Sequence, residues 1–400
     1  MNIKYFSSFT IILLCLCFDT VFPSQNENIC KPISARNSSI DDTPAIYDAL
    51  TKCGNGGTIV IPADETFTIR SPLDFHPCNA CDFQIEGTMK LSDDNLQFWE
   101  DKIALQLANV TRAIFHSLTG SGLIDGNGQK YWDYFGKNSS YKRPHLIHFI
   151  NASDVTFTKI KLKDSPSFFI YIKNNSTNIT ISDLILNATS TSSYEAINTD
   201  GIDTGDCSHV SIRNIQITND DDCVCFKNGS NYIFVHNVTC FGSRGISVGS
   251  LGNAHGIHTV KNVHVSNVKM INGPQAARIK VFPGGSTHGT VFVYNVTIEN
   301  LTVDNCDYAF RVQNCYESPT QQCKTDPSAA ILSNIKIINF TGVTSNNYDP
   351  DVANIDFPPH GTCDLTFQGW NVRSPSRNKT VLCAYYDNPI GVTCTPGAFG

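Results

Sequence analysis

The sequence predicts an all-β chain that winds into a single-domain parallel β-helix, a solenoid of stacked strands. Charged residues make up only 16% of the chain, while the β-branched residues and asparagine that favour strands and turns are abundant. From about residue 155, apolar residues also recur at offsets 0, 2, 5 and 7, in units that start 23 to 39 residues apart. Repeats of this period are typical of solenoids, because each unit can bury its apolar face only against its neighbours.

Seven units share this pattern. They are Val155, Phe157, Ile160 and Leu162; Ile179, Ile181, Leu184 and Leu186; Val210, Ile212, Ile215 and Ile217; Ile233, Val235, Val238 and Cys240; Val263, Val265, Val268 and Met270; Val296, Ile298, Leu301 and Val303; and Ile335, Ile337 and Phe340. Offsets 0 and 2 fall on one face of a strand, so the odd step to offset 5 predicts a sharp bend. Asparagine often occupies that step, as at Asn214, Asn237, Asn267 and Asn300. A sandwich would instead show hairpin signals at regular intervals.

Both ends of the solenoid are expected to be covered. Between Ile40 and Leu50 apolar residues have helical spacing, and Asp42 and Thr43 precede Pro44, which is a helix start signal. A short N-terminal capping helix would shield the strand edge at the open end. The C-terminal tail, which carries several cysteines, is expected to cover the other end. No linker is evident, so residues 25–400 are predicted to form one catalytic domain.

Residues 1–24 have the pattern of a secretory signal peptide. Lys4 gives a short basic region, and residues 11–18 form an apolar run that is too short for a membrane span. We therefore expect a secreted, extracellular protein with no membrane partner. Fourteen cysteines remain after cleavage, an even number suited to disulfides. Dense Asn-X-Ser/Thr sequons indicate a glycoprotein.

The charge of the chain limits its partners. A formal net charge of −7 argues against nucleic acid, which is bound through a basic patch. If the substrate is a polyanion, a few local cations must attract it. The cysteines lack zinc-finger spacing with histidines, so no metal and no cofactor is expected.

Charged residues gather between Asn198 and Lys280. Asp200 ends one strand region, Asp221 and Asp222 end the next, and Arg278 and Lys280 follow. A parallel β-helix stacks equivalent positions about 4.8 Å apart, so these side chains are expected to converge on one face. Hydrolysis of an acidic polysaccharide needs a protonated carboxyl for the glycosidic oxygen and ionised carboxylates that activate water. Crowding of like charges keeps one carboxyl protonated.

Three motifs in this segment resemble those of a known family. Asn198-Thr199-Asp200, Asp221-Asp222-Cys223 and Arg278-Ile279-Lys280 are similar to the motifs of polygalacturonases of glycoside hydrolase family 28. The resemblance extends from the segment 126–132 to the tail and implies a right-handed parallel β-helix. Cys223 sets the register, which leaves Asp220 out of the catalytic group.

The resemblance implies a role for each site residue. Asp221 would be the general acid, and Asp200 and Asp222 would hold and deprotonate water, with inversion at the anomeric carbon. Asn198, Arg278, Lys280 and Tyr316 would bind the uronate, since arginine can grip a carboxylate through two hydrogen bonds. A disulfide between Cys223 and Cys240 is also implied. Cys315–Cys323 and Cys383–Cys394 are candidate local bridges.

Within the family, three segments look more like fungal exo-acting enzymes than endo-acting ones: residues 245–252, 281–285 and 348–356. The expected activity is therefore that of an exopolygalacturonase that cleaves α-1,4-galacturonosyl linkages of polygalacturonate from the non-reducing end. An endo-acting polygalacturonase is the alternative within the family. The expected protein is a monomer, with pectic oligosaccharides as substrate and plant inhibitor proteins as candidate partners.

Arg244 departs from the family pattern. It stands in Ser243-Arg244-Gly245, where the family has a histidine beside the acid. Arginine stays charged and cannot exchange a proton, and a permanent cation would favour ionisation of Asp221. We therefore predict that Arg244 binds a substrate carboxylate in an active enzyme. A weak or inactive relative that binds pectic fragments or acts as a decoy for inhibitors is the alternative. A rhamnogalacturonan hydrolase and a pectate lyase are disfavoured by the intact motifs.

Overall fold

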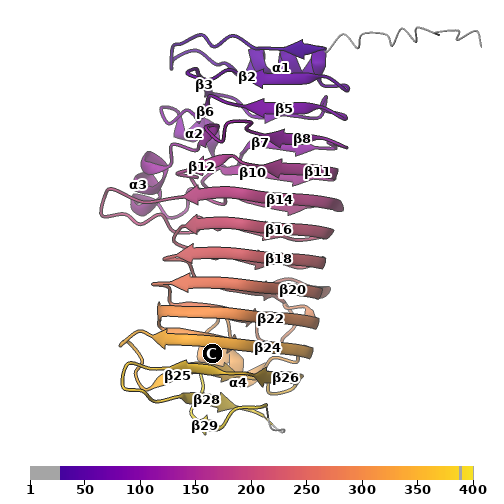
Figure 1. The fold of residues 1–400 in the computed structure, drawn as a ribbon. Coiled ribbons are helices and arrows are strands. Elements are labelled where there is room, and N and C mark those ends of the chain that lie inside the picture. The colour runs from indigo at the N-terminus through magenta and orange to yellow at the C-terminus, as the bar shows by residue number, and fades with distance from the viewer. Residues whose placement is uncertain (1–27, 387–389, 400) are drawn as a thin grey trace, which may run out of the picture.

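The computed structural model describes residues 28–386 and 390–399. The expected signal peptide, residues 1–24, lies outside these residues. The described chain is a parallel β-helix, as the repeat predicted, and it is right-handed, as the family resemblance implied. Its rungs stack along one axis, with α1 at one end and β29 at the other (Figure 1). Among the described residues, no helix is long and apolar enough to cross a membrane.

The strands form two parallel sheets. The larger, 17-stranded sheet contains β1 (Ile29–Cys30), β2 (Thr58–Ile61), β3 (Thr66–Ile69), β5 (Asp82–Ile85), β6 (Thr88–Leu91), β8 (Ile114–His116), β9 (Leu123–Asp125), β11 (Ser153–Thr158), β12 (Lys161–Lys163), β14 (Ser176–Asn187), β16 (Cys207–Thr218), β18 (Ser230–Phe241), β20 (Ile257–Ile271), β22 (Thr290–Cys306), β24 (Ile331–Thr344), β26 (Thr362–Gln368) and β27 (Asn371–Arg373).

The 12-stranded sheet adds one strand per rung, in chain order. It contains β4 (Leu73–Asp74), β7 (Ile103–Ala108), β10 (His145–Ile150), β13 (Ile170–Lys173), β15 (Ile202–Thr204), β17 (Val224–Phe226), β19 (Ile246–Leu251), β21 (Gln275–Val281), β23 (Tyr308–Gln313), β25 (Asp351–Asp356), β28 (Thr380–Ala384) and β29 (Cys394–Pro396).

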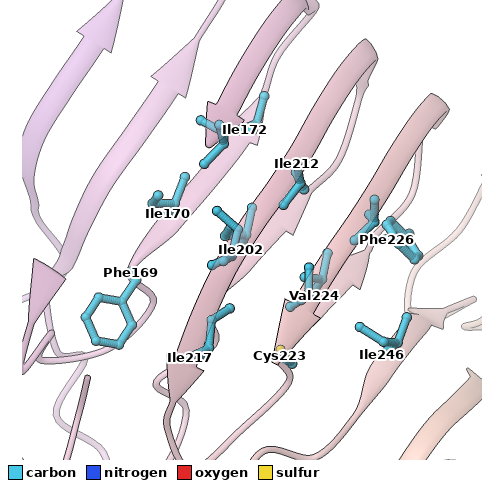
Figure 2. Packing of buried hydrophobic residues seen from close by; sticks show 14 of the residues in the cluster. Phe169, Ile170, Ile172, Ile202, Ile212, Ile217, Cys223, Val224, Phe226 and Ile246 are labelled. Carbon is cyan, nitrogen blue, oxygen red and sulfur yellow. The ribbon is translucent and has the colours of Figure 1, made fainter. Parts of the chain in front are cut away.

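The apolar repeat forms the core because equivalent offsets pair in register. Val210 lies opposite Ile233, which lies opposite Val263, and all three are buried. The 12-stranded sheet contributes its own stack, in which Ile202, Val224 and Ile246 pair across β15, β17 and β19. The side chains of Ile202, Val224 and Ile246 point into the solenoid (Figure 2). Strict in-register stacking is what places the polar residues between them on the opposite face.

The bends fall where asparagine was expected. Asn214, Asn237, Asn267 and Asn300 all have positive φ, between 54° and 56°, a conformation that asparagine tolerates better than most residues. A second line of bend residues runs across β18, β20, β22 and β24. Along it each amide donates to the preceding asparagine at 2.9–3.0 Å. We call this line the asparagine ladder: Asn231, Asn262, Asn295 and Asn334.

The N-terminal helix is confirmed and three further helices were not predicted. α1 (Thr43–Cys53) starts after Asp42 with a proline in its first turn, and buries Ile46 and Leu50 against the first rungs. The others are α2 (Leu96–Trp99), α3 (Gln129–Lys137) and α4 (Thr320–Thr325). α3 projects from the side of the solenoid (Figure 1), because the chain leaves the rung after β9.

The C-terminal tail continues the solenoid instead of forming a separate cover, since β28 and β29 add the last rungs of the 12-stranded sheet. Ten of the fourteen cysteines in the described chain are paired: Cys30–Cys53, Cys78–Cys81, Cys223–Cys240, Cys315–Cys323 and Cys383–Cys394. The three expected bridges are present. Four thiols remain unpaired, so the even count did not mean complete pairing: Cys207, Cys225, Cys306 and Cys363.

Candidate active site

One residue per rung of the 12-stranded sheet forms a line on its outer face. Because core residues such as Ile202 alternate with these positions, their side chains point away from the solenoid interior. Successive members pair in register from β13 to β23. We call this line the outer row: Tyr171, Asp203, Cys225, Ser247, Arg278 and Arg311. The three predicted catalytic carboxylates lie beside it.

Asp200, Asp221 and Asp222 come together as the sequence predicted. Asp200 lies just before β15, and the other two lie just before β17 on the next rung. One carboxylate oxygen from each lies within 4.8 Å of those of the other two. All three residues are buried, and Asp221 is the most exposed of them at 8%. The register places Asp220 outside this group.

Asp222 is held as an anion. Its Oδ1 accepts hydrogen bonds from Ser247 Oγ and Arg278 Nη2, both at 2.6 Å. Its Oδ2 accepts one from Lys280 Nζ at 2.7 Å. Burial opposes ionisation, but the two cations hold the pKa of Asp222 well below its usual range. Both oxygens of this carboxylate are therefore engaged.

The pKa of Asp200 is shifted in the direction opposite to that of Asp222. Burial, followed by the negative charges of Asp203 and Asp221, raises the pKa of Asp200 well above its usual range. Its nearest cation is Lys227, whose Nζ lies 3.7 Å from Asp200 Oδ2. The pKa values of two carboxyl groups in one cluster are thus shifted in opposite directions, because Asp222 faces two close cations and Asp200 faces a more distant one.

Asp203 and Lys227 are members of the site that sequence reasoning did not assign. Asp203 is fully buried, and its oxygens accept no hydrogen bond from the described residues. Lys227 Nζ lies 3.5 Å from it. Burial raises the pKa of Asp203 to about 6, against the opposing charge of Lys227. Asp203 lies three residues after Asp200, so its position was visible in the sequence, but its burial was not.

Asn198 orients Asp221. The Asn198 amide donates to Asp221 Oδ2 at 3.3 Å, and its carbonyl oxygen accepts from Arg143 Nη2 at 2.8 Å. Asp221 Oδ1 accepts the backbone N–H of Asp222 at 2.8 Å. Arg143 is buried and also donates to two backbone carbonyls, those of Pro166 and Ile197. No motif in the sequence marked Arg143, because it lies more than fifty residues before its partner.

Arg244 lies at the solvent side of the carboxylates. Its side chain is 40% exposed, and its Nε lies 3.9 Å from Asp221 Oδ2. The backbone fixes this position, since Arg244 N–H donates to the Asp221 carbonyl at 2.8 Å. His255, the nearby histidine, lies exposed in the turn between β19 and β20. Arg244 is therefore an accessible cation beside the acids.

Arg278, Lys280 and Tyr316 form the other side of the site. The two cations are buried in contact with Asp222, and Arg278 Nη2 also lies 4.0 Å from Asp221 Oδ1. The Tyr316 ring lies 5.2 Å from Lys280 Nζ. Below them, the Cys223–Cys240 disulfide fixes the residue that follows Asp222.

The arrangement suits acid–base chemistry at a glycosidic bond. It combines a carboxyl group with a raised pKa, a fixed carboxylate, a more exposed carboxylate and several cations. Paired carboxyl groups that are pushed to different charge states are what general acid–base catalysis requires. A parallel β-helix with such a cluster on its outer face has the features of a polysaccharide-cleaving enzyme.

Comparison with known proteins identifies the family. The model of glycosyl hydrolases family 28 matches residues 53–394. A protein of Aspergillus flavus named probable endo-xylogalacturonan hydrolase A is 45% identical over 372 residues, which span 93% of this chain and 91% of that protein. The chain belongs to glycoside hydrolase family 28, as its motifs indicated, and it is a pectin-degrading glycoside hydrolase.

Solved structures agree with this assignment. The crystal structure of endo-xylogalacturonan hydrolase from Aspergillus tubingensis matches with a TM-score of 0.91 and 44% identity, over 93% of this chain and 100% of that chain. A polygalacturonase from Erwinia carotovora matches with a TM-score of 0.67 and 19% identity, over 92% of this chain and 97% of that chain. The second similarity reflects the shared fold.

Proposed function

We propose that this protein is an endo-acting hydrolase of xylogalacturonan, a galacturonan that carries xylosyl groups. The observation that carries the proposal is similarity over nearly the full chain, at 44–45% identity, to proteins with that name. The exo-acting expectation rested on three short segments. Relatives that match across the whole chain are named endo-acting, so we propose endo cleavage in its place.

In the proposed mechanism Asp221 donates a proton to the glycosidic oxygen. It is the most exposed of the three carboxylates, and Asn198 and the backbone N–H of Asp222 fix its orientation. A general acid needs access to the leaving group and a fixed direction. These two features favour Asp221 over its neighbours for this role.

Asp200 takes the proton from the attacking water. A base works best when its pKa approaches the working pH, and burial raises the pKa of Asp200 in that direction. Asp222 stays ionised, holds the water and stabilises positive charge that develops on the sugar ring.

Inversion at the anomeric carbon follows from the surroundings of Asp200 and Asp222. The spacing within 4.8 Å is shorter than the roughly 6.5–9.5 Å usual for inverting glycosidases. However, both Asp222 oxygens are held by cations, and Asp200 acts on the attacking water as its base. Neither is a good nucleophile, so water attacks the anomeric carbon directly.

Arg244 binds the uronate carboxylate of the substrate, since its guanidinium is exposed beside Asp221. Tyr316 and the outer edges of Arg278 and Lys280 complete this anionic subsite, while their inner contacts hold Asp222. Asn198 contributes mainly by orienting Asp221. This set supplies the local cations that an acidic protein needs for an acidic substrate.

We also infer that the enzyme acts outside the cell. The basic and apolar pattern of residues 1–24 supports removal of a signal peptide, and the five disulfides are typical of an oxidising compartment. N-terminal sequencing of protein secreted by a fungal host tests this inference, with a new N-terminus near residue 25 as the expected result.

The activity is tested with xylogalacturonan and with unbranched polygalacturonate, using the Asp221→Asn variant as the matched blank. A mixture of oligosaccharides from xylogalacturonan supports the proposal. Release of monomer alone from polygalacturonate would establish the exo-acting alternative. Equal products from the enzyme and the variant would indicate a protein that binds pectic fragments without cleaving them. Proton NMR of the first products reports inversion or retention.

A further inference from the structure

We propose that a pocket beside the three carboxylates receives a xylosyl branch of the substrate. The inference rests on the proposed function, because it assumes a galacturonan that carries neutral pentosyl groups. It assigns a binding site to residues that the acid–base mechanism does not use.

The pocket has a volume of about 450 Å³ and is built around a missing side chain. Gly205 lies on the rung between those of Lys173 and Lys227, so no side chain separates the two lysines. A Cβ atom on Gly205 would lie 2.9 Å from Tyr171 Oη and 3.3 Å from Lys227 Cβ. Glycine therefore keeps open a space that almost any other residue would fill.

The pocket adjoins the candidate catalytic site through one side chain. Lys227 lines the pocket, while its Nζ lies 3.7 Å from Asp200 Oδ2 and 3.5 Å from Asp203 Oδ2. The lysine thus forms a wall between the carboxylates and the pocket. A sugar unit bound at the carboxylates has this space at its side, where a branch can enter without leaving the enzyme surface.

The chemistry of the lining favours a neutral, hydroxyl-rich group. Lys227 Nζ already faces the carboxyl groups of Asp200 and Asp203. Lys173 Nζ lies 5.2 Å from the Tyr171 ring centre, and burial lowers the pKa of this lysine. Apart from Asp206, the other polar side chains carry amide, hydroxyl or imidazole groups: Asn174, Asn228, Ser250, Asn253 and His258.

Hydrogen-bond capacity remains open in this lining. His258 Nδ1 accepts the Gly252 N–H at 3.1 Å, which leaves Nε2 as the ring nitrogen that can donate to a ligand. Tyr171 Oη donates to no acceptor among the described residues. A pentose offers several hydroxyl groups and no charge, which matches such a set. Pockets of roughly 300–1,000 Å³ are the usual size for small ligands, so one sugar ring fits.

The experiment places a larger side chain at the solvent-exposed edge of the pocket. Asn253 lies exposed in the turn between β19 and β20, so Asn253→Trp adds bulk without disturbing the core. His255→Trp is the matched control, because His255 is exposed in the same turn and does not line the pocket. Gly205→Ala adds a methyl group between Tyr171 and Lys227 inside the pocket, and so tests the assignment independently. Enzymes are assayed after removal of N-linked glycans, since Asn174 and Asn228 at the pocket each begin a sequon.

The two substrates are xylogalacturonan and the same polymer after enzymatic removal of its xylose. We expect Asn253→Trp to lower kcat/KM on the branched polymer about tenfold, mainly through KM, and to change kcat/KM on the debranched polymer by less than about twofold. Gly205→Ala should act in the same direction, and His255→Trp should change neither value. Equal melting temperatures establish that the variants are folded.

The possible results distinguish a failure of the pocket assignment from a failure of the proposed function. If the unmodified enzyme cleaves xylogalacturonan but neither filling variant changes the preference for branched over debranched polymer, the pocket assignment alone is wrong. Equal losses on both polymers would also overturn it. If the unmodified enzyme does not cleave xylogalacturonan, the proposed function fails and the pocket assignment fails with it.

Discussion

The asparagine ladder and the outer row are both straight lines of side chains across stacked rungs, but they differ in what each neighbour presents. Along the ladder every rung offers the same amide, which donates to one neighbour and accepts from the other. Along the outer row the group changes at every rung from the Tyr171 hydroxyl to the Arg278 guanidinium, and only the last two rungs, Arg278 and Arg311, offer the same group.

The difference follows from the rung spacing. Amides repeat well at about 4.8 Å because each is both a donor and an acceptor. Like charges at this spacing repel one another, so a charged line must alternate in sign or be compensated by its neighbours. The three carboxylates and Asp203 meet this condition with Lys227, Arg278 and Lys280. The repeated asparagine amides stabilise the solenoid, whereas the site forms where successive rungs carry different charged groups.

Asp222→Asn should have the largest effect, because it removes the anion that Arg278 and Lys280 share. Loss of one member of a buried ion pair costs about 3–5 kcal/mol of unfolding free energy, and hydrolysis should be abolished. Urea denaturation and product analysis measure the two effects. Asp220→Asn is the control, since Asp220 is only half-buried, and it should change stability by less than about 1 kcal/mol. Equal destabilisation by both variants would contradict the proposed role of the ion pairs.

Asp203 should make the stability of the enzyme depend on pH. The folded protein retains a proton on this carboxyl up to about pH 6, whereas the unfolded chain loses it near its ordinary pKa of about 3.9. Folded protein therefore binds more protons between these values, and the contribution of Asp203 to stability falls as pH rises through this window. The total change is about 3 kcal/mol.

Comparison with Asp203→Asn isolates this effect. The unfolding free energy of the unmodified enzyme minus that of the variant should fall by about 2 kcal/mol between pH 4 and pH 7. Urea denaturation at a series of pH values measures the difference. A difference that stays constant with pH, or rises with it, would show that Asp203 is ionised throughout.

The same contrast explains how much the sequence could predict. Repetition made the solenoid visible, since the offsets of units such as Val210–Ile217 and the bend asparagines recur many times. α1 was visible for a local reason, the helix start at Pro44. α3 was not visible, because the segment after β9 leaves the repeat.

The site was predictable only where family motifs mark it. Asp200, Asp221 and Asp222 came together as expected, but Arg143 and Lys227 carried no signal. Each acts through contacts with residues on other rungs, and Arg143 lies more than fifty residues from Asn198. Burial of Asp203 depends on several chain segments at once. Such properties arise from stacking and are absent from any local pattern.

Two variants at one ladder position should separate side-chain hydrogen bonding from backbone strain. Asn262 has a φ of 54°, donates to Asn231 and accepts from Asn295, both at 2.9 Å. Asn262→Gly removes the hydrogen bonds and keeps the backbone relaxed, so we expect a loss of about 1 kcal/mol. Asn262→Ala adds the cost of a left-handed residue, for a total of about 2–3 kcal/mol.

Urea denaturation measures both Asn262 variants, and hydrolysis of the polymer should be unchanged in each. Equal losses in the two variants would mean that the positive φ carries no cost at this position. A loss of activity would mean that the ladder and the site are coupled.

Arg244→Gln should have the smallest effect and decides what the unusual arginine does. Its guanidinium is 40% exposed and lies 3.9 Å from Asp221, so it can reach a substrate carboxylate without leaving a buried partner unpaired. If Arg244 binds the uronate, the variant should raise KM about tenfold and leave kcat within about threefold. A fall in kcat with unchanged KM would place Arg244 in the proton transfer instead. If the unmodified enzyme is inactive at every pH and Arg244→His restores hydrolysis, the arginine has silenced an acid that the family keeps active through histidine.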